Sequence, residues 1–111
     1  MVLAFHGGMG TAQSLKNGYD IVRKSDKEGF IVAFPNGTSR LKSGLFATWN
    51  AGNCCGNAVN SEADDVAFVK KVVDTIKKDY KVSKVFAMGM SNGGMFSYRL
   101  ACDIPEYFDG I

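Results

Sequence analysis

The chain has 111 residues, a length that corresponds to one domain at most. Hydrophobic residues make up 46% and charged residues 22%, which is typical of a globular protein with a buried core. The net charge of +2 argues against a nucleic-acid partner or an anionic membrane surface. No apolar run approaches the roughly 20 residues that a membrane helix needs.

The first half of the chain alternates between strand and helix patterns. The apolar stretch Val2–Phe5 predicts a core strand, and it has neither the basic leader nor the cleavage site of a signal peptide. Apolar residues at helical spacing predict a helix over 11–26, which Gly18 is expected to weaken without abolishing it. A second strand is expected over 30–34, before Pro35.

The second half begins with a long segment, 35 to about 60, that has no periodicity and is rich in Gly, Asn and Ser. A loop of more than about 15 residues in a compact domain is usually functional or held by tertiary contacts. Valines at three- and four-residue steps then predict a helix over 64–80. A third strand is expected over 84–89 and a helix over 95–102, and residues 109–111 are interpreted as the approach to a fourth strand.

This order of elements predicts an α/β fold with a parallel sheet and right-handed crossovers. The carboxyl ends of parallel strands face one crevice. We therefore expect the turn at His6–Gly10, the 35–60 loop and Ser91 to meet there.

The third strand runs into a Gly-x-Ser-x-Gly motif formed by Gly89, Ser91 and Gly93, and a helix follows. A serine on a tight turn between strand and helix is the nucleophile elbow of α/β-hydrolases. The glycines are expected to be necessary because a Cβ atom would clash where the strand end passes the helix start. The Gly-x-Ser-x-Gly spacing alone is weak evidence for a nucleophile elbow, and the alternative is an ordinary turn between strand and helix with a surface serine. The strand before the motif and the helix after it favour the elbow.

Five motifs occur in order along the chain: His6-Gly7-Gly8, Phe34-Pro35-Asn36-Gly37-Thr38, Thr48-Trp49-Asn50-Ala51-Gly52-x-Cys54-Cys55-Gly56, Asp64-Asp65-Val66-x-Phe68, and Gly89-Met90-Ser91-Asn92-Gly93-Gly94-Met95 through Arg99-Leu100-Ala101-Cys102. Together they resemble the polyhydroxybutyrate depolymerase / feruloyl esterase family of secreted bacterial α/β-hydrolases, related to carbohydrate esterase family one. The resemblance implies an α/β-hydrolase core with a three-stranded parallel sheet, in the spatial order 2-1-3, and flanking helices. It also implies that residues 1–111 form a single partial domain, without the family's N-terminal strands and its C-terminal acid and histidine.

The resemblance implies a serine carboxylic ester hydrolase of the feruloyl, acetyl or polyhydroxyalkanoate type, secreted and acting through an acyl-enzyme. Ser91 falls on the nucleophile, and the N–H groups of Gly8 and Asn92 fall on the oxyanion hole, with Met9 as an alternative to Gly8. The implied partner is a small or polymeric ester, and no cofactor or metal is implied. Trp49 and Met9 are candidates for substrate contact, although Trp49 is equally a candidate core residue.

The chain departs from the family pattern after the nucleophile, where the family's acid and histidine follow. Residues 92–111 contain no histidine. The opposing hypothesis is therefore a catalytically incomplete hydrolase-fold fragment with no activity of its own, which would be able to self-associate through an exposed sheet edge. His6, the only histidine, is expected to have a structural role rather than to act as the base.

The three cysteines leave at least one without a partner in the chain. Adjacent cysteines rarely bond each other and the family is secreted, so a disulfide from Cys55, or from Cys54, to Cys102 is one hypothesis. Three cysteines and one histidine without C-x-x-C spacing do not predict a metal site. Asp64 and Asp65 are interpreted as helix-cap residues rather than catalytic acids.

Overall fold

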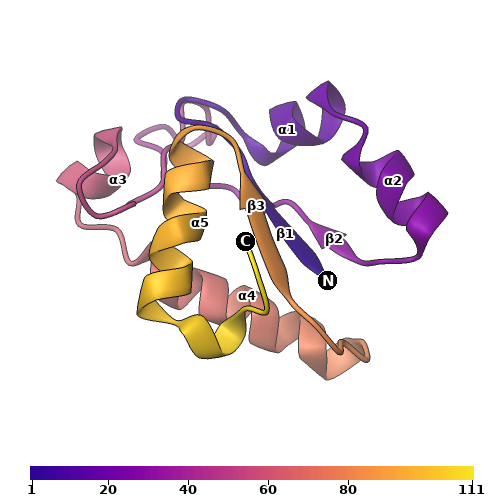
Figure 1. The fold of residues 1–111 in the computed structure, drawn as a ribbon. Helices are drawn as coiled ribbons and strands as arrows, with labels where there is room; N and C mark the ends of the chain where they lie inside the picture. The colour runs from indigo at the N-terminus through magenta and orange to yellow at the C-terminus, as the bar shows by residue number, and fades with distance from the viewer.

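The structure is a computed structural model that describes all 111 residues. At its centre is a parallel sheet of three strands, β1 (Val2–Phe5), β2 (Val32–Ala33) and β3 (Phe86–Gly89), in the spatial order β2-β1-β3 (Figure 1). Strand β1 pairs with β3 along its whole length but with β2 at only two residues. The expected α/β fold and strand order are confirmed, although β2 and β3 are shorter than the sequence pattern indicates.

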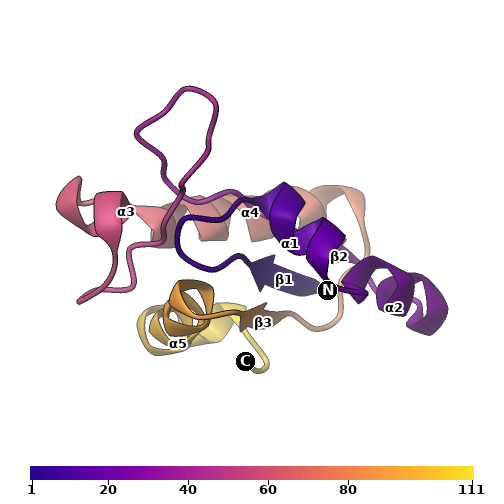
Figure 2. The same cartoon turned by 90° about the horizontal axis from the view of Figure 1, so that it is seen from above.

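Helices flank both faces of the sheet. They are α1 (Ala12–Gly18), α2 (Ile21–Glu28), α3 (Gly56–Asn60), α4 (Asp65–Asp79) and α5 (Asn92–Asp103), with a final 3-10 turn, η1 (Pro105–Tyr107). Figure 1 shows α1 and α2 on one side of the strands and α4 and α5 on the other, and in the view from above in Figure 2 α1 lies in front of the strands and α4 behind them. No helix combines the length and the apolar character needed to span a membrane.

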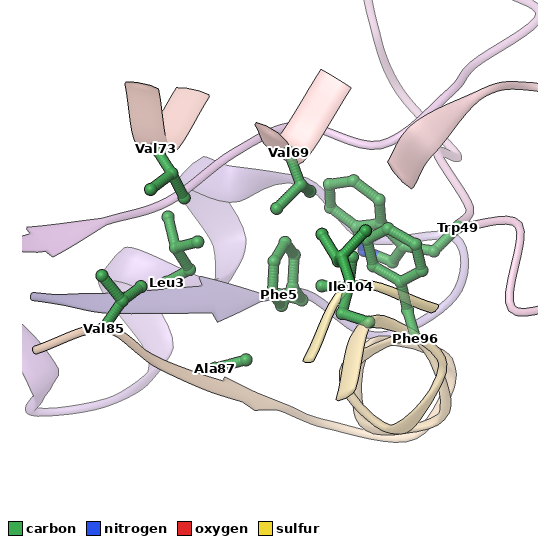
Figure 3. Packing of buried hydrophobic residues seen from close by; sticks show 10 residues of the cluster. Leu3, Phe5, Trp49, Val69, Val73, Val85, Ala87, Phe96 and Ile104 are labelled. Atoms are coloured by element: carbon green, nitrogen blue, oxygen red, sulfur yellow. The ribbon is translucent and has the colours of Figure 1, made fainter. Parts of the chain in front are cut away.

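The main core lies between the sheet and the helices α4 and α5 (Figure 3). Alternate residues of a strand share a face, so Leu3 and Phe5 of β1 point to the same side. Residues four apart on a helix also share a face, which brings the two α4 valines Val69 and Val73 onto the sheet. Trp49, from the long loop, fills the end of this core and is fully buried.

The opposite face of β3 is less well covered. Since Val85 and Ala87 are in the core, the alternating residues Phe86 and Met88 point to the other face, where they are 39% and 44% exposed. At the free edge of β3, Gly110 forms an isolated parallel bridge with Phe86, as expected for the approach of a fourth strand. The expected self-association through a sheet edge stays a prediction.

The expectation of one helix before β2 is wrong, because the segment forms two helices. Gly18 ends α1, and Tyr19 has an extended backbone with φ −139° and ψ 151°. Glycine loses more conformational freedom in a helix than any other residue, and here this cost ends the helix instead of only weakening it. The break lets the Tyr19 hydroxyl donate a hydrogen bond to Sδ of Met90 at 3.1 Å, next to Ser91.

Replacing the buried Leu3 by alanine tests the core that supports the sheet. We expect Leu3→Ala to lower the free energy of unfolding by about 2–5 kcal/mol, because it removes buried apolar contacts and leaves a cavity. The control Leu41→Ala, at an exposed position, should change it by less than about 0.5 kcal/mol. Urea unfolding measures both, and equal effects would contradict this assignment of the core.

Candidate active site

The turn between β3 and α5 places Ser91 at the surface in a strained conformation. Its φ of 50° and ψ of −119° lie in a region that non-glycine residues rarely adopt. A Cβ atom on Gly89 would lie 2.3 Å from the carbonyl oxygen of Gly93, and one on Gly93 would lie 2.3 Å from that of Phe5. The two glycines therefore permit the close approach of strand and helix, as the motif predicts.

The turn that follows β1 lies beside the Ser91 turn (Figure 1). An ideal Cβ on Gly7 would be 3.8 Å from Cβ of Ser91, and one on Gly8 would be 3.4 Å from Cβ of Asn92. The backbone of this glycine-rich turn is therefore within side-chain reach of the serine. The geometry is compatible with an oxyanion hole, in which N–H groups face the carbonyl oxygen of a bound ester.

The structure favours Gly8 over Met9 as the first oxyanion donor. The Met9 N–H donates to the carbonyl of Ala47 at 2.8 Å, so it is already used. The Gly8 N–H has no acceptor within the chain. Asn92 is the first residue of α5, where helical N–H groups lack partners in the preceding turn and the helix dipole favours negative charge. The assignment of Gly8 and Asn92 to an oxyanion hole stays a prediction.

A buried hydrogen-bond network joins the two turns. The side chain of Asn92 accepts from the Trp49 backbone N–H at 2.7 Å and donates to the Trp49 carbonyl at 3.0 Å. The Trp49 indole N–H donates to the carbonyl of His6 at 3.1 Å, and its ring stacks on Phe96 at 5.0 Å. Trp49 is completely buried, so its expected role in substrate contact is wrong. It connects the helix start to the turn after β1 instead.

His6 is locked in a structural role. It is 1% exposed, its Nδ1 lies 2.8 Å from the Gly7 carbonyl, and its Nε2 accepts the Gly37 N–H at 3.0 Å. This arrangement requires the neutral ring with its proton on Nδ1. Burial lowers the pKa of His6, an effect that the Gly7 contact partly opposes. Since both ring nitrogens are engaged, His6 is not available as a base for Ser91, whose hydroxyl has no hydrogen-bonded side chain.

The two adjacent aspartates have different roles. Asp64 accepts the Ala67 N–H and caps α4, as expected. Asp65 is buried and accepts hydrogen bonds from the Thr38 hydroxyl at 3.1 Å and the Asn50 N–H at 2.7 Å. Burial raises the pKa of Asp65, and these hydrogen bonds oppose the rise. The capping interpretation is therefore wrong for Asp65, which holds the long loop against α4. Since Asp64 already caps α4, the second of the two adjacent acids was the signal in the sequence for a different role of Asp65.

The cysteines do not pair as expected. Cys54 is bonded to its neighbour Cys55, and Cys102 is a free thiol exposed near the end of α5. The predicted Cys55–Cys102 bridge is therefore absent, because Cys55 is engaged with the adjacent residue. No group of three or more His, Cys, Asp or Glu side chains is arranged to hold a metal ion.

Met9, the other candidate for substrate contact, is 62% exposed and directly follows Gly8. Its φ of 66° lies in the left-handed region, a backbone conformation that few non-glycine residues adopt. Contact between Met9 and a substrate stays a prediction. Arg40, Leu45 and Phe46 line the same hollow as Met9, and no motif or periodicity in the sequence marks these three residues.

A methyl group at Gly93 tests the contact between the helix start and β1. We expect Gly93→Ala to destabilise the fold by about 2 kcal/mol or more, since a backbone carbonyl cannot move aside as a side chain can. Gly18→Ala is the matched control, because a Cβ there meets nothing within 4 Å; it should be neutral or stabilising by about 1 kcal/mol. Urea unfolding distinguishes the two, and a Gly93 variant as stable as the parent would refute the contact.

The buried His6 predicts a pH dependence of stability. Its folded-state pKa is lowered from 6.5, so below this value the unfolded chain binds more protons. The free energy of unfolding should therefore fall as the pH drops below 6.5, by up to about 1.4 kcal/mol per pH unit. His6→Asn cannot titrate and should lack this part of the slope. Urea unfolding between pH 5 and pH 7.5 tests this, and identical slopes would contradict it.

Comparison with known proteins relates the chain to esterases. The family model described as Esterase PHB depolymerase matches residues 1–111. The chain is 31% identical over 110 residues to feruloyl esterase B of Neurospora crassa, covering 98% of this chain and 36% of that protein. It is 31% identical over 110 residues to a probable acetylxylan esterase A of Aspergillus clavatus, covering 97% and 34%.

The putative esterase NocK of Nocardia uniformis subsp. tsuyamanensis is 27% identical over 113 residues, covering 100% of this chain and 31% of that protein. The chain thus spans about a third of the length of these relatives. No solved structure is significantly similar to it. Because the family model matches the chain from its first residue to its last, the chain belongs to the Esterase PHB depolymerase family.

Proposed function

We propose that this chain carries the nucleophile and the oxyanion hole of a serine carboxylic ester hydrolase that works through an acyl-enzyme. One observation carries the proposal: the exposed, strained Ser91 at the start of α5 lies beside the turn of Gly7 and Gly8, and the Gly8 N–H in that turn has no acceptor in the chain. Membership of an esterase family supports the same chemistry.

In the proposed reaction, Oγ of Ser91 attacks the ester carbonyl carbon while a base takes its proton. The carbonyl oxygen becomes negative and accepts hydrogen bonds from the N–H groups of Gly8 and Asn92. The tetrahedral intermediate then expels the alcohol, which receives the proton from the base. Water attacks the acyl-enzyme by the same route and releases the acid, which restores the serine.

Because His6 is fully engaged, we propose that the base and its orienting acid lie outside these 111 residues. The relatives act on feruloyl and acetylxylan esters by their names. For this chain we propose acyl or feruloyl esters on polysaccharide, short aryl esters, or hydroxyalkanoate polyesters. The extracellular location that the family resemblance implies stays a prediction.

The engaged His6 also favours a second possibility for the chain on its own, a formed elbow without turnover. The two possibilities predict different behaviour toward the same reagents. A fluorophosphonate reacts in a single step, in which the Oγ–P bond forms, the P–F bond breaks, and solvent takes the Oγ proton as fluoride leaves; without a base in the chain this step is slow but needs no second attack by water. Turnover of an ester also needs a base to activate water.

We expect a fluorophosphonate to label Ser91 in the parent chain and in the control Ser83→Ala, whose residue is exposed. Ser91→Ala should reduce labelling to background, as measured by intact mass and peptide mapping. Labelling that survives in Ser91→Ala would contradict the proposed nucleophile. Hydrolysis of p-nitrophenyl acetate that disappears in Ser91→Ala would indicate a working esterase, whereas labelling without turnover would indicate an elbow that lacks its base.

A further inference from the structure

A groove of about 390 Å³ opens beside Met9, one residue from the proposed oxyanion donor Gly8. Its walls come from α3 and from the loop of residues 39–47, which projects from the rest of the chain beside α3 (Figure 2). This volume lies within the range of about 300–1,000 Å³ that is usual for small-ligand sites. The groove is separate from the structural network around Trp49.

Backbone hydrogen bonds fix the projecting loop to the oxyanion turn. Thr38 and Thr48 exchange two hydrogen bonds, at 2.9 and 3.0 Å, and so close the base of the loop. The Met9 N–H donates to the Ala47 carbonyl at 2.8 Å, and the Ala47 N–H donates to the Gly10 carbonyl at 3.3 Å. A ligand seated against this loop is therefore held in a defined position relative to the turn beside Ser91.

The groove offers apolar contact area that the fold leaves exposed. Met9 and Phe46 are 62% and 57% exposed, and Leu41 and Leu45 are about half exposed. Phe46 has a φ of 57°, an uncommon conformation for a bulky residue and one found preferentially at ligand sites. Clustered exposed apolar side chains rimmed by polar groups are typical of a binding surface.

Arg40 is the only charged residue that lines the groove. Its Nε donates to Oδ1 of Asn57 on α3 at 2.9 Å, which orients the guanidinium. Arg40 takes part in none of the three ion pairs of the chain, so no carboxylate neutralises it. The Nη groups remain available, and a guanidinium binds a carboxylate through two parallel hydrogen bonds.

We propose that this groove selects ester substrates that carry a free carboxylate on an apolar body, with Arg40 as the residue that recognises the carboxylate. The proposal rests on the esterase function proposed above, since the groove would hold the part of the ester that extends from Ser91 past Met9. Apolar side chains bind the body of this part, and the charge of Arg40 distinguishes anionic from neutral esters.

The test measures binding of 4-phenylbutyrate and of its neutral amide to the whole chain labelled with ¹³C-methyl methionine. We expect both to shift the Met9 methyl signal, assigned with Met9→Leu, and the carboxylate to bind about five-fold more tightly. Arg40→Gln should abolish this preference, and Arg40→Lys should retain part of it. The matched control Arg23→Gln, at an exposed arginine on α2, should leave the preference intact.

The proposal would be overturned by any of three results. The acid and the amide bind with equal affinity, the preference for the acid survives in Arg40→Gln, or the ligands shift the signals of Met88 and Met90 instead of that of Met9. Fluorophosphonate labelling of Ser91 in the same samples separates this failure from that of the esterase function. Labelling of Ser91 without a response of the Met9 signal overturns only the proposed carboxylate recognition in the groove. A charge-dependent Met9 response without labelling overturns the serine chemistry and leaves the carboxylate site standing.

Discussion

The site depends on one close backbone contact, where the start of α5 rests against the end of β1. A Cβ on Gly93 would lie 2.3 Å from the Phe5 carbonyl oxygen and 2.5 Å from that of His6. Only a glycine lets these segments meet without displacing the backbone. The contact brings the first N–H groups of α5 to the turn after β1, and it is the reason that Ser91 and Gly8 lie together although more than 80 residues separate them.

Buried polar groups then hold the contact in register. The Asn92 side chain forms hydrogen bonds with both the N–H and the carbonyl of Trp49. The Trp49 indole N–H donates to the His6 carbonyl. The two ring nitrogens of His6 contact the Gly7 carbonyl and the Gly37 N–H. No buried side-chain nitrogen or oxygen is left without a partner, so the network fixes a single arrangement. The residue that looks most like a catalytic base therefore acts as a structural link, and the most prominent aromatic residue is part of the core.

Local patterns predict a parallel sheet, α4 and the glycines of the elbow, because these depend on periodicity and on steric rules within a few residues. The strand order was implied by the family resemblance and not by these patterns. The partners of Trp49 and His6 were not predictable, since their hydrogen bonds join residues 43 and 31 positions apart. The end of α1 at Gly18 and the short helix α3 depend on small differences in free energy that tertiary contacts decide. The pairing of Cys54 with Cys55 likewise opposes the usual behaviour of adjacent cysteines.

The central claim is that the hydroxyl of Ser91 and two backbone N–H groups converge on one carbonyl-sized position. The most direct measurement is a crystal structure of the chain after reaction with a fluorophosphonate. We expect a phosphorus atom bonded to Oγ of Ser91, with one phosphoryl oxygen within about 3.2 Å of the backbone nitrogens of both Gly8 and Asn92. A phosphoryl oxygen directed to solvent, or to groups other than these two, would contradict it.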